Sequence, residues 1–318
     1  MIRYRAFRNS DPPALAEIWR SQPAGHGRVQ QMSAGLFEQF VLSKPYFDNA
    51  GLIVAVDDDR PIGFAHATFG PTECGQRLSR QFGSTLLVMV STEYRRQGIG
   101  SALLSHSEVY LRGHGAQVLY GGGIAPLHGF YLGLYGGSEL PGVLDTDVGA
   151  QRLFLSHGYR EIDRVLVLER PLAGYRPPVD RIQLQVRRRS TISTLPDPPS
   201  TSWWDACSWC GLDQTRYELT LRDVGRVVAT AQAWSLEPLS AGWGVRAAGI
   251  LGLEVEESVR RQGLGVFLVS DIMRQLAAQG IGLVQVQTMQ ANQPALKFYE
   301  KLGFRLVDQG AVYRKDGA

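Results

Sequence analysis

Two short stretches of this sequence combine arginine, glutamine and glycine at a spacing that could hold a phosphate group. They read Tyr94-Arg95-Arg96-Gln97-Gly98-Ile99-Gly100 and Val259-Arg260-Arg261-Gln262-Gly263-Leu264-Gly265. Each follows a strand-like run and precedes apolar residues at near-helical spacing. The first N–H groups of a helix lack internal partners and favour an anion, glycine permits close approach, and arginine adds charge-assisted contacts. A solvated basic turn would explain one such stretch, but two in matching contexts predict two anion sites.

These residues resemble the coenzyme A pyrophosphate loop of the GNAT superfamily of acetyltransferases, which reads Arg/Gln-x-x-Gly-x-Gly/Ala after a strand. A second family signature closes the sequence. The stretch Asn292-Gln293-Pro294-Ala295-Leu296-Lys297-Phe298-Tyr299-Glu300-Lys301-Leu302-Gly303-Phe304 resembles N-x-x-A-x-x-F-Y-E-K-x-G-F at every fixed position. The first copy has only a partial counterpart, with Asp147 at the place of Asn292 and Phe154 at the place of Tyr299. The sequence therefore resembles two GNAT domains in tandem.

The resemblance implies an acetyl-CoA-dependent N-acyltransferase that transfers acetyl directly to a primary amine in a ternary complex. It also implies which residues bind coenzyme A: Val90, Arg95, Arg96, Gln97, Gly98, Ile99, Gly100, Val255, Arg260, Arg261, Gln262, Gly263, Leu264, Gly265 and Asn292. In this family a backbone N–H at the strand before the loop polarises the thioester carbonyl, the place held by Val90 and Val255. Tyr299 stands where the family places the general acid for the leaving thiolate.

The general base is less clearly marked. Glu254 and Glu256 flank Val255, and either could take a proton directly or through water, although a carboxylate on the surface is the simpler interpretation. Because the first copy lacks the phenol, the second copy is the expected catalyst. A non-catalytic acyl-CoA sensor or scaffold, and catalysis by the first copy with a structural second copy, are the alternatives.

The resemblance also implies the fold class. We expect an α/β (α+β) protein of two domains, each with a mixed, largely antiparallel sheet, flanking helices and a splayed strand pair that holds acyl-CoA. The predicted domains are 1–172 and 182–318, joined by a linker over 173–181 that follows from its prolines and glycine. Residues 182–186 are predicted as a strand, and the helical region that follows is short for the family.

The first copy carries an insertion. Gly98 and Gly158 are 60 residues apart, whereas Gly263 and Gly303, their counterparts, are 40 apart, which places about 20 extra residues near 126–143. Long loops at such a place tend to be functional. Its aromatic residues are therefore candidate substrate contacts, with a surface excursion packed on the partner domain as the alternative: Phe130, Tyr131 and Tyr135.

Composition limits the other function classes. A net charge of +3 over 318 residues is too small to indicate nucleic-acid binding. The pair Cys207-x-x-Cys210 has no second pair to complete a zinc site, so no metal is expected. No apolar run reaches the ~18 residues of a membrane span, and no signal peptide is evident. We expect a cytoplasmic monomer or homodimer that acts on a small-molecule or peptide amine.

Overall fold

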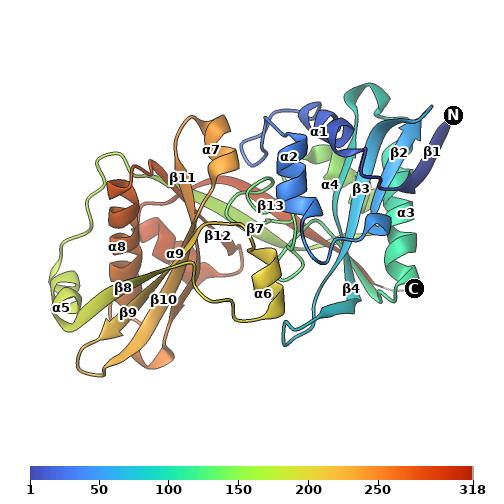
Figure 1. Ribbon diagram of the computed structural model, residues 1–318. Helices are drawn as coiled ribbons and strands as arrows, with labels where there is room; N and C mark the ends of the chain where they lie inside the picture. The colour runs from blue at the N-terminus through green and yellow to red at the C-terminus, as the bar shows by residue number, and fades with distance from the viewer. Residues whose placement is uncertain (317–318) are drawn as a thin grey trace. The chain divides into compact units, whose positions relative to one another are not determined.

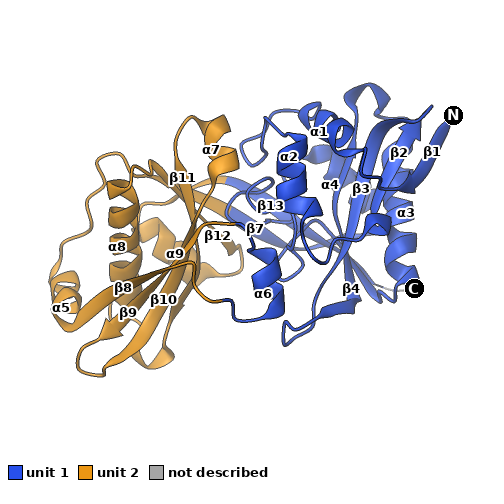
Figure 2. Ribbon diagram, viewed as in Figure 1, with its two compact units in different colours: residues 1–166, 200–211, 308–318 blue, residues 167–199, 212–307 orange. Residues whose placement is uncertain are grey.

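The computed structural model describes residues 1–316, which form two compact units (Figure 2). Unit 1 contains residues 1–166, 200–211 and the chain from 308 onward, and unit 2 contains residues 167–199 and 212–307. The sequence predicts domains over 1–172 and 182–318. In the structure, two segments from the second of these ranges, residues 200–211 and those from 308 onward, lie in unit 1. The last strand of the chain completes the sheet of unit 1, and the strand that closes the first half continues into unit 2. Each unit is therefore built from both halves of the sequence.

Unit 1 is a sheet flanked by helices (Figure 1). Its strands are β1 (Ile2–Ala6), β2 (Leu52–Asp57), β3 (Arg60–Pro71), β4 (Leu78–Val90), β5 (Val118–Gly121), β6 (Val143–Leu144), and parts of β7 (Arg160–Pro171) and β13 (Arg305–Asp316). Its helices are α1 (Pro12–Arg20), α2 (Ala34–Phe37) with the π-helical turn Glu38–Leu42, α3 (Ile99–Gly113), α4 (Val148–Ser156) and α6 (Trp203–Ser208). The strand order is β1-β2-β3-β4-β5-β13, antiparallel except for the parallel pair β4–β5. This is the largely antiparallel sheet that the sequence predicts.

Unit 2 repeats the arrangement. Its strands, besides parts of β7 and β13, are β8 (Ser190–Pro196), β9 (Gln214–Leu221), β10 (Arg226–Ser235), β11 (Ala247–Val255) and β12 (Leu283–Met289). Its helices are α5 (Arg181–Arg189), α7 (Glu237–Trp243), α8 (Leu264–Ala278) and α9 (Gln293–Lys301). The strand order is β7-β12-β11-β10-β9-β8, and β11–β12 is a parallel pair.

The predicted strand over 182–186 is wrong, because this segment is helical and forms α5. The Asp180 side chain accepts a hydrogen bond from the Gln183 N–H at 2.8 Å and so caps the helix. Gln183 and Val186 are buried at helical spacing, and three arginines in the last turn suit the negative end of the helix dipole. A run of nine residues is too short for periodicity alone to separate helix from strand.

In each unit the parallel pair separates part of the way along. β4 and β5 pair only as far as Thr85 and Gly121, and β11 and β12 only as far as Gly249 and Gln285. The central strands β4 and β11 then continue to Val90 and Val255. In each unit the central strand also carries a bulge against its antiparallel neighbour, one extra residue that interrupts the ladder. The splayed pair thus leaves an opening at the strand ends, beside the start of α3 or α8.

Candidate active site

The two predicted phosphate loops adopt the same backbone conformation. Gly98 and Gly263, with φ of 81° and 84°, precede α3 and α8, and neither helix has a side-chain cap on its first N–H groups. The arginines two residues earlier, Arg96 and Arg261, also have positive φ, 62° and 61°. Alternation of this kind turns successive N–H groups toward one point and forms a nest for an anion. Both loops therefore have the backbone conformation of an anion nest.

Unit 2 has an open groove that starts at its loop. The groove has a volume of about 1160 Å³. It is lined by residues from β11, the loop, the start of α8, the end of β12 and the start of α9: Gly252, Leu253, Glu254, Val255, Glu256, Glu257, Val259, Arg260, Arg261, Gly263, Leu264, Gly265, Val266, Gln287, Thr288, Asn292, Pro294, Ala295, Phe298 and Tyr299. The structure therefore brings together most of the second copy's predicted site residues. The groove could bind an elongated anionic molecule, because it has backbone N–H groups at one end and an apolar wall along the rest.

Tyr299 lies on α9 and contributes to the groove lining. Its side chain is 7% exposed, and its ring packs edge-on against Phe298 and Phe304 at centroid distances of 5.2 and 5.5 Å. Asn292 begins the same helix, and its Oδ1 accepts a hydrogen bond from the Ala295 N–H at 3.2 Å. The cap and the aromatic contacts fix the phenol at the groove wall.

The two predicted base residues differ in their surroundings. Glu256 forms an ion pair with Arg226 and accepts a hydrogen bond from the Ser258 hydroxyl at 2.7 Å. Arg226 lowers the pKa of the Glu256 carboxyl, so this carboxylate is a weak proton acceptor. Glu254 is exposed at the groove rim and takes part in no such ion pair within residues 1–316.

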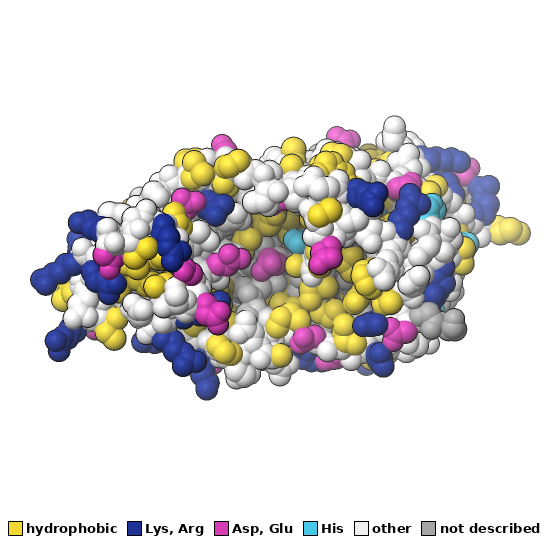
Figure 3. Space-filling model, turned by 90° about the horizontal axis from the view of Figure 1, so that it is seen from below, with side chains coloured by type: hydrophobic (Ala, Val, Ile, Leu, Met, Phe, Trp, Pro, Cys, Tyr) yellow, Lys and Arg dark blue, Asp and Glu magenta, His cyan; other side chains and the backbone are white. Residues whose placement is uncertain are grey.

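Positive charge gathers at the end of unit 2 that carries α5 (Figure 3). This helix packs on α8, and its Gln183 Nε2 donates to the Gly263 carbonyl oxygen at 3.4 Å. The arginines of its last turn therefore add to the field around the phosphate loop, which favours an anionic ligand.

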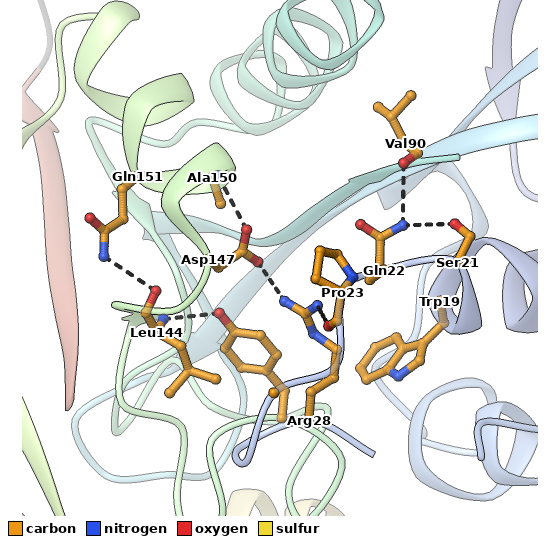
Figure 4. Close-up of polar contacts among 12 residues, drawn as sticks. Trp19, Ser21, Gln22, Pro23, Arg28, Val90, Leu144, Asp147, Ala150 and Gln151 are labelled. Carbon is orange, nitrogen blue, oxygen red and sulfur yellow. Dashed lines mark hydrogen bonds and ion pairs between the residues drawn. The ribbon is translucent and has the colours of Figure 1, made fainter. Parts of the chain in front are cut away.

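The corresponding opening in unit 1 is closed by its own chain (Figure 4). The Gln22 Nε2 donates to the Val90 carbonyl oxygen at 3.2 Å, and its Oε1 accepts from the Arg95 Nη2 at 2.5 Å. Arg28, 8% exposed, forms an ion pair with Asp147 at 2.9 Å and donates to the Pro23 carbonyl oxygen at 3.1 Å. The segment 22–28 thus connects the end of β4 to the start of α4. It lies over the opening of unit 1, whereas the equivalent opening of unit 2 is free.

The first copy also lacks the acid. Phe154, at the place of Tyr299, is 1% exposed and stacks on Tyr313 at a centroid distance of 5.8 Å. It packs so closely on β5 that a Cβ at Gly121 would lie 2.6 Å from its ring. A phenylalanine side chain has no hydroxyl that could protonate a leaving group.

The aromatic residues of the insertion, which the sequence offers as candidate substrate contacts, lie inside unit 1 and not on its surface. Phe130, Tyr131 and Tyr135 are at most 1% exposed. The Tyr131 hydroxyl lies 2.9 Å from Nδ1 of His66, and the Tyr135 hydroxyl accepts from the Leu144 N–H at 2.9 Å. The insertion folds inward and fills the interior of unit 1 with aromatic rings, because each ring gains more by burial than by lying in a surface loop.

The chain between the first two strands differs between the two copies. In the first copy the chain between the first two strands supplies Gln22 and Arg28, whereas residues 200–211, between β8 and β9, belong to unit 1. The Lys44 ammonium donates to the Ser208 carbonyl oxygen at 2.7 Å, and the Trp204 N–H donates to the Gly75 carbonyl oxygen at 2.9 Å.

Sequence reasoning missed Gln22 and Arg28, because residues 21–31 indicate only a polar loop. It also missed the bulge in β11, where Gly252, with φ of 62°, and Leu253 interrupt the ladder between Leu251 and Glu254. A glycine inside a strand-like run was the available signal. Backbone N–H groups at a bulge lie outside the ladder, so this stretch is a further candidate for polarising a carbonyl.

A strand–loop–helix anion site beside a splayed parallel pair defines an acyltransferase architecture, and the comparisons with known proteins agree. The sequence matches the Acetyltransferase (GNAT) family over residues 13–131 and 184–304. The chain belongs to this family and carries two copies of its domain. None of the curated proteins matches the sequence.

Solved structures show the same fold at low identity. A GCN5-related glucosamine N-acetyltransferase region of a fungal multi-domain GH3 β-N-acetylglucosaminidase is 18% identical with a TM-score of 0.74, and the match covers 99% of this chain but only 38% of the fungal one. A tandem GNAT protein from the clavulanic acid biosynthesis pathway is 13% identical with a TM-score of 0.67, covering 100% and 99%. A GCN5-related N-acetyltransferase from Sphaerobacter thermophilus is 16% identical with a TM-score of 0.66, covering 100% and 97%.

Two further observations concern residues 1–316. No helix in this range is long and apolar enough to cross a membrane. No three His, Cys, Asp or Glu side chains in this range are grouped so that they could hold a metal ion.

Proposed function

We propose that this protein transfers acetyl from acetyl-CoA to a primary amine, and that the second copy does the chemistry. The observation that carries the proposal is the open groove of unit 2, which runs from the phosphate loop at Gly263 to the phenol of Tyr299. The residues present fit acetyl-CoA. The nest at Arg261 and Gly263 suits its pyrophosphate, and the apolar wall formed by Leu253, Val255 and Phe298 suits its pantetheine arm.

Each task of the reaction has a group in the groove. Arg260, Arg261 and the first N–H groups of α8 bind the pyrophosphate. A backbone N–H of β11 between Gly252 and Val255 polarises the thioester carbonyl. The nitrogen of the free amine then forms a bond to the carbonyl carbon and the carbon–sulfur bond breaks. The Tyr299 hydroxyl protonates the sulfur and regains a proton from the nitrogen as the amide forms. Such direct transfer needs donor and acceptor bound together, which corresponds to a ternary complex.

The first copy has a different role in this proposal. Its loop keeps the conformation for a phosphate, but Gln22, Arg28 and Asp147 occupy the place of the acyl arm. We infer that it loads no acetyl group and serves as a structural partner. A chain that binds acyl-CoA without catalysis, as a sensor, is the second candidate function, and the closed state of the first copy is the observation that favours it.

A thiol-release assay separates the two functions. The protein is mixed with acetyl-CoA and a panel of amines that includes glucosamine, spermidine and a tripeptide with a free α-amino group. Glucosamine belongs in the panel because of the activity named for the fungal relative. An enzyme releases coenzyme A only when an accepted amine is present. A sensor binds acetyl-CoA, as its thermal shift records, and releases no thiol with any amine.

A further inference from the structure

Unit 2 has a second cavity, separate from the groove that binds the donor in the proposed function. Its volume is about 420 Å³, and no described residue lines both the cavity and the groove. This volume lies in the range of small-molecule sites, about 300–1,000 Å³. The cavity is at the other end of α8 and β11, where α7 packs on the start of β11 (Figure 1). None of the roles assigned so far uses it.

The equivalent place in unit 1 is filled with aromatic rings. Phe69, Tyr110 and His114 pack together there, with ring centroids 4.4, 6.1 and 6.3 Å apart. The packing is tight, because a Cβ added to Gly51 on the neighbouring strand edge would lie 3.2 Å from the Tyr110 ring. Unit 1 therefore has a solid core at this end of its helix.

Unit 2 has no ring at any of these three positions. Phe69 pairs with the residue 15 positions before Gly98, and in unit 2 the residue that pairs 15 positions before Gly263 is a serine. Tyr110 and His114 lie 12 and 16 positions after Gly98, and glutamine occupies both positions after Gly263. The three residues that replace the rings in unit 2 are Ser235, Gln275 and Gln279.

The inner wall of the cavity is apolar. It includes the buried side chains of Tyr217, Trp234 and Leu276, which are 1%, 2% and 6% exposed. Side chains that border a cavity lose the contacts that a filled core would give them. The carbon chain of a ligand would restore these contacts and be removed from water at the same time.

Three charged side chains also line the cavity, and all three are exposed: Asp213, Glu237 and Arg246. Within residues 1–316 neither carboxylate forms an ion pair. The Arg246 Nη1 donates to the Gln279 carbonyl oxygen at 2.9 Å, which holds the guanidinium at the end of α8. Two negative groups and one positive group are complementary to a ligand with two cationic groups and one anionic group. A basic amino acid has this pattern, with its α-ammonium, its side-chain cation and its α-carboxylate.

The cavity is too far from the donor for its ligand to be acetylated there. Ala248 lines the cavity and Gly252 lines the groove, and the two residues are four positions apart on β11, or about 13 Å of extended chain. Attack on a thioester needs the reacting atoms about 3–3.5 Å apart. A molecule in this cavity is therefore a third ligand, distinct from the donor and the acceptor.

We propose that this cavity of unit 2 is a binding site for a basic amino acid. Asp213 and Glu237 bind its two cationic groups, Arg246 binds its carboxylate, and the buried side chains enclose its carbon chain. The inference goes beyond the proposed transferase function and does not depend on it, because binding can be measured without turnover. A failure of either one therefore leaves the other standing.

Isothermal titration calorimetry of the full chain with L-lysine tests the proposal, with and without saturating acetyl-CoA. L-norleucine lacks the second cation, and cadaverine lacks the carboxylate. We expect lysine to bind equally well in both conditions, and each analogue to bind about 10–100-fold more weakly, which corresponds to the loss of one charge-assisted hydrogen bond. If norleucine binds as well as lysine, the class of ligand is wrong. If acetyl-CoA displaces lysine, the ligand lies in the groove and the cavity is not its site.

Variants assign the binding to this cavity. Ser235→Phe places in unit 2 the ring that the first copy has at the same position, and it should abolish lysine binding. Glu237→Gln removes one carboxylate at an exposed position and should weaken lysine binding about 10–100-fold. The matched control is Asp223→Asn, a change in the turn between β9 and β10 at a carboxylate paired with Arg189, and it should match the wild type.

Thermal unfolding of each variant shows whether it is folded. If Ser235→Phe does not fold, Glu237→Gln decides, because its side chain is exposed and its loss leaves the core unchanged. A wild type that gives no heat with lysine at millimolar concentration overturns the proposal. So does a lysine affinity that is the same in Glu237→Gln, Asp223→Asn and the wild type.

Discussion

Replacing Gly98 or Gly263 with alanine tests which of the two copies binds acetyl-CoA. Both residues have left-handed φ, 81° and 84°, so alanine at either costs about 1–2 kcal/mol of backbone strain. At Gly98 an added Cβ meets nothing within 4 Å. At Gly263 it would lie 2.6 Å from Ile182 Cγ2 and 3.1 Å from Gln183 Nε2, so α5 must shift, which adds about 1–3 kcal/mol.

We expect Gly98→Ala to lower Tm by about 2–8 °C, since 1 kcal/mol corresponds to about 2–4 °C for a unit of this size. Its acetyl-CoA shift should equal that of the wild type. Gly263→Ala should lower Tm further and lose the shift, because the donor adds about 2.7 kcal/mol at a hundredfold excess over Kd only while its site is intact. Differential scanning calorimetry with and without acetyl-CoA, together with equilibrium dialysis for stoichiometry, measures both effects.

The reverse pattern would refute the assignment. If acetyl-CoA stabilises Gly263→Ala but not Gly98→Ala, the first copy holds the donor despite Gln22. If each variant loses half of the bound acetyl-CoA, both copies are loaded.

Three further predictions follow from single side chains. Tyr299→Phe removes one hydroxyl and should reduce turnover about 10²–10⁴-fold with acetyl-CoA affinity nearly unchanged, as single-turnover and binding measurements would show. Arg28→Ala leaves the Asp147 carboxylate without its partner and should lower the free energy of unfolding by about 2 kcal/mol in urea titration, below the ~3–5 kcal/mol of a fully buried pair. Burial lowers the pKa of His66 to about 3, so its contribution to stability is complete above its unfolded pKa of about 6.5 and is lost as the pH falls toward 3. Stability should drop by about 2 kcal/mol between pH 7 and pH 5 from this group, and His66→Phe should show a smaller drop.

Local sequence patterns predict the elements of this fold well. Asp11-Pro12-Pro13 marks the start of α1, although the Asp11 carboxylate pairs with Arg5 at 2.8 Å instead of capping the helix. Asp58 and Asp59, both at positive φ, make the predicted hairpin turn between β2 and β3. The two phosphate loops can also be predicted from local sequence. A glycine directly before a helix allows a left-handed backbone conformation, and there are few other reasons for it to occur at the same place in both copies.

The state of the two sites depends on contacts that no local pattern contains. Arg28 meets Asp147 across 119 residues, and Gln22 meets Val90 across 68. These pairs form because the fold brings distant segments of the chain together, so the closure of the first site follows from topology.

The exchange of segments between the halves also bears on how the protein is made. Residues up to 166 of unit 1 leave the ribosome well before the strand from 308 that completes their sheet. At about 5–20 residues per second, the delay between the two is roughly 7–28 s. During that time β5 has no partner on the side that β13 will occupy, and such an unpaired strand can join the wrong chain. The sheet of unit 1 therefore stays incomplete until β13 has been made, and until then only a chaperone or another protective contact can cover that edge.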